Sequence, residues 1–100
     1  MNRIQQSKYN YQTNSISLDN YVENFKNLNN KFIIKIDTDG NEYNILQGAK
    51  KTISNKNCKS LFIETREKTK KNINKLLTNY NFKLIGKYNS NEIWVKNLLN

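Results

Sequence analysis

Short apolar runs and helically spaced apolar positions alternate along the chain, which is typical of strands that alternate with helices. Phe32–Asp37 and Leu61–Glu64 each hold a short apolar run and predict two parallel strands, the first of them covered on both faces. Helical spacing predicts three helices, over 18–27, 42–53 and 67–80. Alternating positions from Phe82 to Val95, with a turn at Asn89-Ser90-Asn91, predict a terminal hairpin. The predicted order is helix, strand, helix, strand, helix, strand, strand.

Details of the helices and loops sharpen these expectations. Ser17 is the expected N-cap of the first helix, whose apolar face holds Leu18, Tyr21, Val22 and Phe25. Gly48 lies inside the second predicted helix, where glycine costs about 1 kcal/mol relative to alanine. We expect it to permit a close approach between helix and sheet. The polar loop 54–59 is expected to hold Cys58.

The composition favours one small domain with a modest core. Hydrophobic residues make up 36% of the chain, and the mean hydropathy is -0.89. The net charge of +9 raises the question of nucleic-acid binding. However, the chain holds 20 Asn, 15 Lys and 11 Ile, all encoded by AT-rich codons, and its two arginines form no cluster. A compositional bias explains the lysines equally well, so we do not assign nucleic-acid binding.

Cysteine and histidine usage excludes several kinds of chemistry. With one cysteine and no histidine, the chain can form no internal disulfide, no Cys-His nucleophile and no metal site of the His or Cys kind. A reducing, cytoplasmic compartment is the simplest interpretation. The longest unbroken apolar runs are three residues, so we predict no membrane span.

Charged residues cluster where the two predicted parallel strands end. Side chains alternate along a strand, so Lys35 and Asp37 share one face about 6–7 Å apart, and Lys35 needs a partner if it is buried. Glu64 ends the next strand, and adjacent strands lie about 4.8 Å apart. These three residues can serve as general base, metal ligand or substrate clamp. The structural alternatives are that Asp37 caps the following turn, that Lys35 extends to the sheet edge with its stem packed, and that Glu64 is an acid at the start of the next helix.

Two further acids, Asp39 and Glu42, are expected to stabilise the next helix N-terminus electrostatically. The surrounding segment FIIKIDTDGNEYNILQGA resembles the central KIDxDG or KIDxEG motif of the FkbM-type methyltransferases. SISLDNYV, LFIE and EIWVKN are similar to other segments of that family, in the same order. The resemblance covers about 14–96 and implies a partial methyltransferase domain at 15–97 after a polar arm at 1–14.

The family resemblance implies a fold class, a cofactor and a reaction. The implied fold is the C-terminal half of a Rossmann-like α/β sheet, with two parallel strands and their helices followed by an antiparallel hairpin. The implied reaction is O-methyl transfer from S-adenosylmethionine to a sugar or small-metabolite hydroxyl. Asp37 would lie near the donor and the acceptor hydroxyl, with Lys35 and Glu64 fixing its geometry.

The donor side is where the chain departs from the family. No glycine precedes Gly40, so we expect the glycine-containing donor loop to be absent and the chain alone to be inactive. One alternative is a non-catalytic half-domain that acts through a partner chain, and another is a basic binding module. The outer edge of Phe32–Asp37 is also expected to self-associate or to pair with a partner chain.

Overall fold

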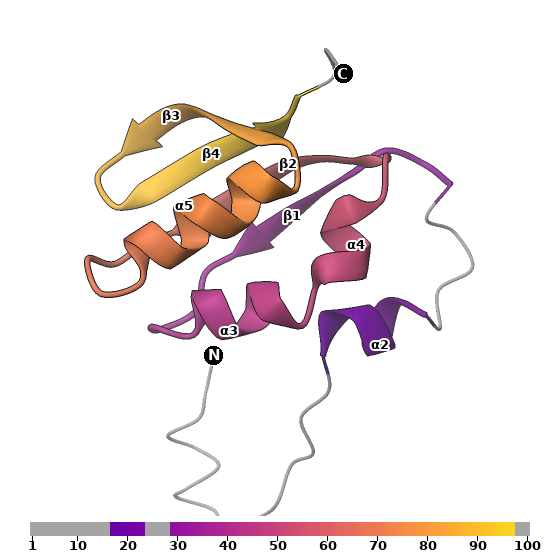
Figure 1. Ribbon diagram of the computed structural model, residues 1–100, viewed down its shortest axis with the longest axis horizontal. Coiled ribbons are helices and arrows are strands. Elements are labelled where there is room, and N and C mark those ends of the chain that lie inside the picture. The colour runs from indigo at the N-terminus through magenta and orange to yellow at the C-terminus, as the bar shows by residue number, and fades with distance from the viewer. Residues whose placement is uncertain (1–16, 24–28, 98–100) are drawn as a thin grey trace, which may run out of the picture.

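The computed structural model describes residues 17–23 and 29–97, which form a small α/β fold (Figure 1). The elements in chain order are α2 (Leu18–Val22), β1 (Phe32–Ile36), α3 (Glu42–Gln47), α4 (Lys50–Ser54), β2 (Cys58–Glu64), α5 (Lys70–Asn79), β3 (Phe82–Tyr88) and β4 (Asn91–Lys96). Within this part of the chain the sheet has four strands in the order β1-β2-β4-β3. β1 and β2 are parallel, and β4 is antiparallel to both of its neighbours. The predicted element types and the terminal hairpin are therefore confirmed.

The sheet is covered on one face. Figure 1 shows α3, α4 and α5 on the same side, where Ile36, Leu61 and Trp94 form the core and are at most 5% exposed. The opposite face carries Ile33, which is 63% exposed, and Phe62, which is 40% exposed. The expectation that β1 is covered on both faces is therefore wrong for the residues described, since α3, α4 and α5 all lie on the other face.

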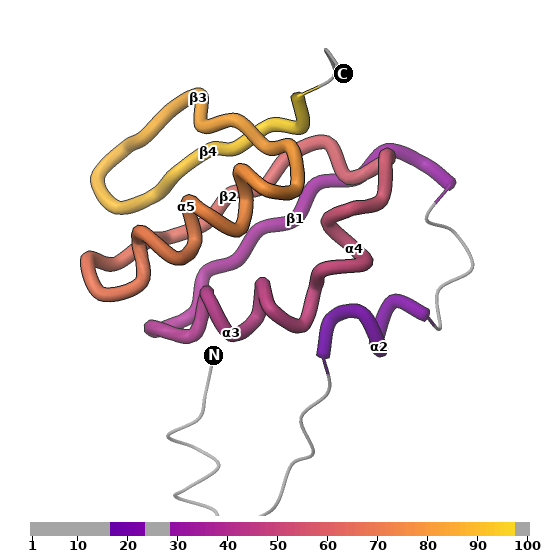
Figure 2. Tube along the Cα trace, in the orientation of Figure 1, coloured from indigo at the N-terminus to yellow at the C-terminus, as the bar shows by residue number. Residues whose placement is uncertain are grey.

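The predicted helix over 42–53 is two helices. Figure 2 shows the chain turning between α3 and α4, at Gly48 and Ala49. Gly48 does not serve a helix-to-sheet contact as expected, because a Cβ on it would lie 2.9 Å from the Ser17 Cβ. It lets the start of α2 approach the end of α3, where the Asp19 N–H donates to the Gly48 carbonyl at 2.9 Å.

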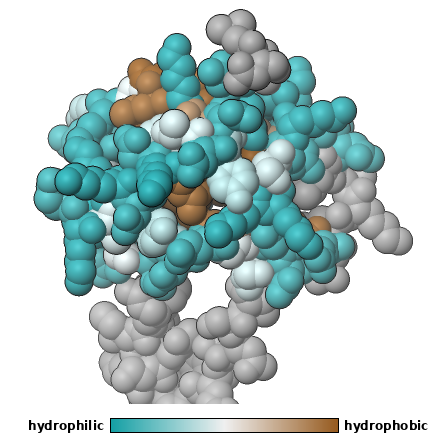
Figure 3. All heavy atoms as spheres, in the orientation of Figure 1, coloured by the Kyte–Doolittle hydropathy of each residue, from teal (hydrophilic) through white to brown (hydrophobic). Residues whose placement is uncertain are grey.

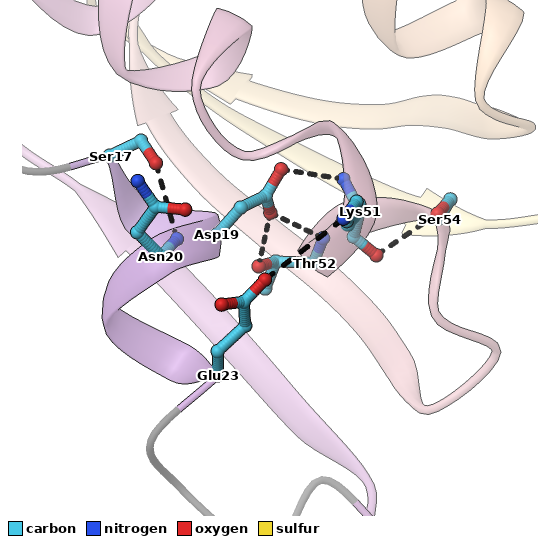
Figure 4. Close-up of polar contacts among 7 residues, drawn as sticks. All are labelled: Ser17, Asp19, Asn20, Glu23, Lys51, Thr52 and Ser54. Atoms are coloured by element: carbon cyan, nitrogen blue, oxygen red, sulfur yellow. Dashed lines mark hydrogen bonds and ion pairs between the residues drawn. The ribbon is translucent and has the colours of Figure 1, made fainter.

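α2 is fixed to the rest of the molecule by polar contacts (Figure 4). Ser17 is its N-cap as predicted, with Oγ accepting from the Asn20 N–H at 3.1 Å. Asp19 accepts hydrogen bonds from the Lys51 N–H, the Thr52 N–H and the Thr52 hydroxyl. The predicted apolar face is only partly buried, because Leu18 packs against the core but Tyr21 is 51% exposed. The expected extension to residue 27, with Phe25, lies outside the described residues.

The remaining differences concern element boundaries. α5 begins at Lys70, later than predicted, and buries Ile73, Leu76 and Leu77. β2 begins at Cys58, so this residue is a buried strand residue and not a loop residue as expected. Burial raises the pKa of the Cys58 thiol to about 11, which keeps it protonated and unreactive at neutral pH. Among the described helices, none has the length and apolar character needed to cross a membrane.

Candidate active site at the carboxyl edge of the sheet

The carboxyl ends of β1 and β2 lie side by side. Ile36 is paired with Ile63 in the parallel ladder, so the next residues along, Asp37 and Glu64, follow at the same edge. Both share the face of Lys35 and Phe62, opposite the helices. The predicted convergence of two acids on adjacent parallel strands is therefore present in the backbone arrangement.

Arg66 connects the two strand ends. Its Nη2 donates to Asp39 Oδ1 at 3.2 Å and to Glu64 Oε1 at 3.4 Å. The other carboxylate oxygen of Glu64 accepts from the Ser90 hydroxyl at 3.3 Å, so the hairpin turn also reaches this edge. Sequence reasoning missed Arg66 and Ser90. The available signal was an arginine two residues after a strand that itself ends in an acid.

Asp37 differs from these acids. It is exposed, and no hydrogen bond or ion pair to it occurs among the residues described. Lys35 is likewise exposed and forms no ion pair with Asp37. The argument that Lys35 needs a partner therefore does not apply here, because its face of the sheet is open to solvent. The edge thus presents one unengaged carboxylate beside one ammonium.

The loop between β1 and α3 follows Asp37 and contains a left-handed turn. Gly40 has φ of +92, a left-handed conformation that favours glycine over any residue with a Cβ. The following residue, Asn41, is the N-cap of α3 but makes no side-chain cap; its Oδ1 accepts instead from the Asn44 side chain at 3.1 Å. The turn predicted at Asp39-Gly40 is thus built by the glycine and by Arg66.

Glu42 lies in the first turn of α3, as expected of a helix-start acid, but it is buried. It is 1% exposed, and neither carboxylate oxygen has a hydrogen-bond partner among the described residues. The Thr38 hydroxyl is also buried without a partner in this part of the chain. Desolvation therefore acts on Glu42 without a compensating contact.

A groove lies beside β1, next to α2 and α3. It has a volume of about 500 Å³ and is lined by Leu18, Ile34, Ile36 and Ile45, with Lys35, Asp37 and Thr38. The groove is thus mostly apolar, and the two charged groups belong to the strand itself. Within the described ranges, no group of three His, Cys, Asp or Glu side chains is placed to hold a metal ion.

The family model of the methyltransferase FkbM domain matches residues 4–84. The chain therefore belongs to the FkbM methyltransferase family. The match begins well before the expected domain start at residue 15, and it ends within β3, short of the EIWVKN segment. No curated protein and no solved structure matches the chain.

Proposed function

We propose that this chain forms the acceptor side of an O-methyltransferase site that acts on a hydroxyl of a sugar or another small metabolite, with S-adenosylmethionine as donor. Membership of the FkbM family supports the reaction class. The proposal places the acceptor hydroxyl at Asp37.

The observation that supports the proposal is that Glu64 and Asp39 have hydrogen-bond partners at this edge, whereas Asp37 has none among the residues described. Arg66 and Ser90 already contact both oxygens of Glu64, and Arg66 also contacts Asp39. Asp37 keeps both oxygens available among the residues described. A free carboxylate can accept a hydrogen bond from a hydroxyl, orient it, and take its proton as the oxygen is methylated.

Glu64 then acts as a positioning residue. Its contacts with Arg66 and Ser90 join the ends of β1, β2 and the hairpin turn, which fixes the edge on which Asp37 stands. Lys35 lies on the same face as Asp37, about 6–7 Å along the strand. Its ammonium can contact a second oxygen of a bound polyol.

The described residues do not by themselves fit S-adenosylmethionine. Gly40 follows a strand, but its turn is closed by the Arg66 side chain and is not a glycine-rich loop. The groove beside β1 offers one carboxylate, Asp37, which the proposal reserves for the acceptor. We therefore expect calorimetry to give millimolar or weaker binding of S-adenosylmethionine to this chain, and micromolar binding would contradict that expectation.

Titration of the ¹⁵N-labelled chain with a panel of methyl glycosides tests the acceptor assignment. A bound glycoside should shift the backbone amides of 37–41 and 64–66. Asp37→Asn should weaken the response on the order of tenfold, because a hydrogen bond to a charged acceptor is lost. In any methyl transfer from labelled S-adenosylmethionine, the same variant should lower the rate about 10²-fold or more.

The matched control is Lys83→Gln, which removes a charge from the same open face at the opposite end of the sheet, where Lys83 pairs with Val95. It should leave the response unchanged. Full binding by Asp37→Asn together with its loss in Glu64→Gln would assign the acceptor to Glu64 and refute the proposal.

A further inference from the structure

The outer edge of β1 is unpaired within the described sheet. The Phe32 N–H donates to the Asn57 carbonyl at 2.8 Å, toward β2. Because N–H and C=O directions alternate along a strand, Phe32, Ile34 and Ile36 point toward β2. The backbone groups of Ile33 and Lys35 therefore point outward, away from the sheet, where no strand of the described part of the chain pairs with them.

Nothing in this strand protects its edge in the usual ways. The chain contains no proline, and the irregularity in the ladder between Phe32 and Ile33 lies on the β2 side, where Lys59 is the extra residue. Natural sheets block such edges with prolines, bulges or several charges. Here the only charged residue within β1 is Lys35.

We propose that β1 pairs with β1 of a second copy of this chain, antiparallel, about a two-fold axis at Ile34. This register places Ile33 opposite Lys35 of the partner, so the outward-pointing backbone groups of both strands meet as reciprocal hydrogen-bonded pairs. The two four-stranded sheets then form one continuous sheet.

Charge complementarity selects this register. Lys31 falls opposite the partner's Asp37 on the open face, and by symmetry this pair occurs twice. Neither residue has an ion pair among the described residues. If the pairing register shifts by two residues in one direction, Lys35 lies opposite the partner's Lys35. If it shifts by two residues in the other direction, Lys31 lies opposite the partner's Lys35. Like charges directly opposite each other are destabilising.

The apolar residues agree with the same register. On the helix face, Phe32 falls opposite the partner's Ile36, and Ile34 falls opposite its own copy. The groove beside this edge is lined by Leu18 and Ile45 next to Ile34 and Ile36, so it offers apolar surface to the incoming strand. The half-buried side chains of Phe32 and Ile34 would then gain cover.

Disulfide trapping of single-cysteine variants tests the register, with Cys58→Ser as background. Ile34 and its own copy form a directly opposed pair that is not hydrogen-bonded, and the Cα atoms of such pairs lie about 4.5 Å apart. This distance is within disulfide range, so Ile34→Cys should form a covalent dimer. Ile33→Cys is the stringent control, since Ile33 is more exposed. It lies about 8–9 Å from its own copy by strand rise, too far to bridge, and should stay monomeric on a non-reducing gel.

Sedimentation at low salt tests the charge pairs. Lys31→Asp should weaken dimerisation on the order of tenfold, because two attractive pairs become repulsive. The double variant Lys31→Asp, Asp37→Lys restores opposite charges and should recover the dimer. These residues are exposed, so the variants should fold.

Equal trapping of both cysteine variants, or a monomer at every concentration, would overturn the proposal. So would a double variant no better than Lys31→Asp. The dimer and the proposed acceptor site share Asp37, so the two are tested by separate readouts. Wild-type dimerisation and Ile34→Cys trapping are measured without glycoside, and glycoside binding is measured by amide shifts at the carboxyl edge.

Discussion

At the scale of single residues, Asp19 caps a helix that is 32 and 33 positions away in the sequence. Ala49 stands at the N-cap of α4 and offers no side-chain acceptor. Asp19 replaces it by accepting from the second and third residues of that helix, Lys51 and Thr52, at 2.9 and 2.8 Å. A carboxylate at a helix N-terminus also interacts favourably with the helix dipole. Figure 4 shows this arrangement from the side of α2.

We expect Asp19→Asn to lower the free energy of unfolding by about 1–3 kcal/mol, because one acceptor is replaced by a donor. Burial raises the pKa of Asp19, but the hydrogen bonds from Thr52 and Lys51 outweigh burial and lower it below its ordinary value of 3.8. The folded state therefore binds the proton more weakly than the unfolded state. The contribution of Asp19 is complete above about pH 4 and is lost as the pH falls through the folded-state pKa.

Denaturant unfolding of both proteins at several pH values measures this effect. The difference between wild type and Asp19→Asn should shrink on acidification. A constant difference down to pH 2 would show that the carboxylate charge is not what α4 requires.

For Glu42, in contrast to Asp19, we expect removal of the charge to stabilise the fold. Its carboxylate is buried and has no hydrogen-bond partner in the described part of the chain, so only the N-terminus of α3 offsets its burial. Glu42→Gln keeps the shape and removes the charge, and should raise the free energy of unfolding by about 1 kcal/mol. Chemical denaturation measures it, with the exposed Glu67→Gln on the same scaffold as control. A loss of stability would indicate a donor to Glu42 outside the described residues.

At the scale of elements, the contact between Ser17 and Gly48 sets how closely α2 docks. Gly48 has φ of -90, which any residue adopts, so an added Cβ acts through contact alone. With Ser17 Cβ at 2.9 Å, Gly48→Ala should cost about 1–3 kcal/mol and displace α2. Thermal melts of the variant against wild type measure this cost.

A double-mutant cycle identifies the cause. Ser17→Gly removes the opposing Cβ, so Gly48→Ala should cost clearly less in that background. Equal costs in both backgrounds would show that the Ser17 Cβ is not the obstacle, because the entropy of the unfolded chain alone would make Gly48→Ala stabilising.

The sequence predicted the strand and helix order because each element has its own hydrophobic period. It failed where tertiary contacts decide local structure. The helix predicted over 42–53 breaks at Gly48 because Asp19 supplies the cap for a new helix there, a contact no local pattern encodes. Cys58 was placed in a loop because Lys56, Asn57 and Lys59 around it are polar, yet β2 extends back to pair it with Phe32.

The candidate site was predictable in position but not in its contacts. Strand ends of a parallel pair must meet at one edge, so Asp37 and Glu64 could be brought together from the sequence. Which acid stays unengaged depends on Arg66 and on Ser90, the second of which comes from a distant hairpin turn. Contacts between side chains from segments that are distant in the sequence cannot be predicted from the pattern of any one segment.

At the scale of the whole molecule, the two faces of the sheet differ in character. The side seen in Figure 3 is mostly hydrophilic, with small hydrophobic patches. The face away from α3, α4 and α5 exposes Ile33, Phe62 and Tyr88, which are 63%, 40% and 76% exposed. Exposed apolar side chains of this kind promote association and dye binding.

Substitutions of Phe62 and of its neighbour Leu61 test which face of the sheet contributes more to the stability of the fold. Both Phe and Thr are favoured in strands, so Phe62→Thr should not disturb β2. It should lower the free energy of unfolding by no more than about 1 kcal/mol, since Phe62 is already partly exposed to solvent. Leu61→Thr is the matched control on the helix face. Leu61 is fully buried, so the same kind of change should cost about 3 kcal/mol or more.

Binding of the dye ANS and the solubility limit report on the same face. Phe62→Thr should lower the dye fluorescence and raise the solubility limit, while Leu61→Thr should raise the fluorescence by loosening the core. If Phe62→Thr instead cost as much stability as Leu61→Thr, the open face would have to be covered in solution. Because Phe62 lies opposite Lys35 in the ladder, such a cover would also reach the face that presents Asp37, and access of an acceptor to that carboxylate would then depend on what covers it.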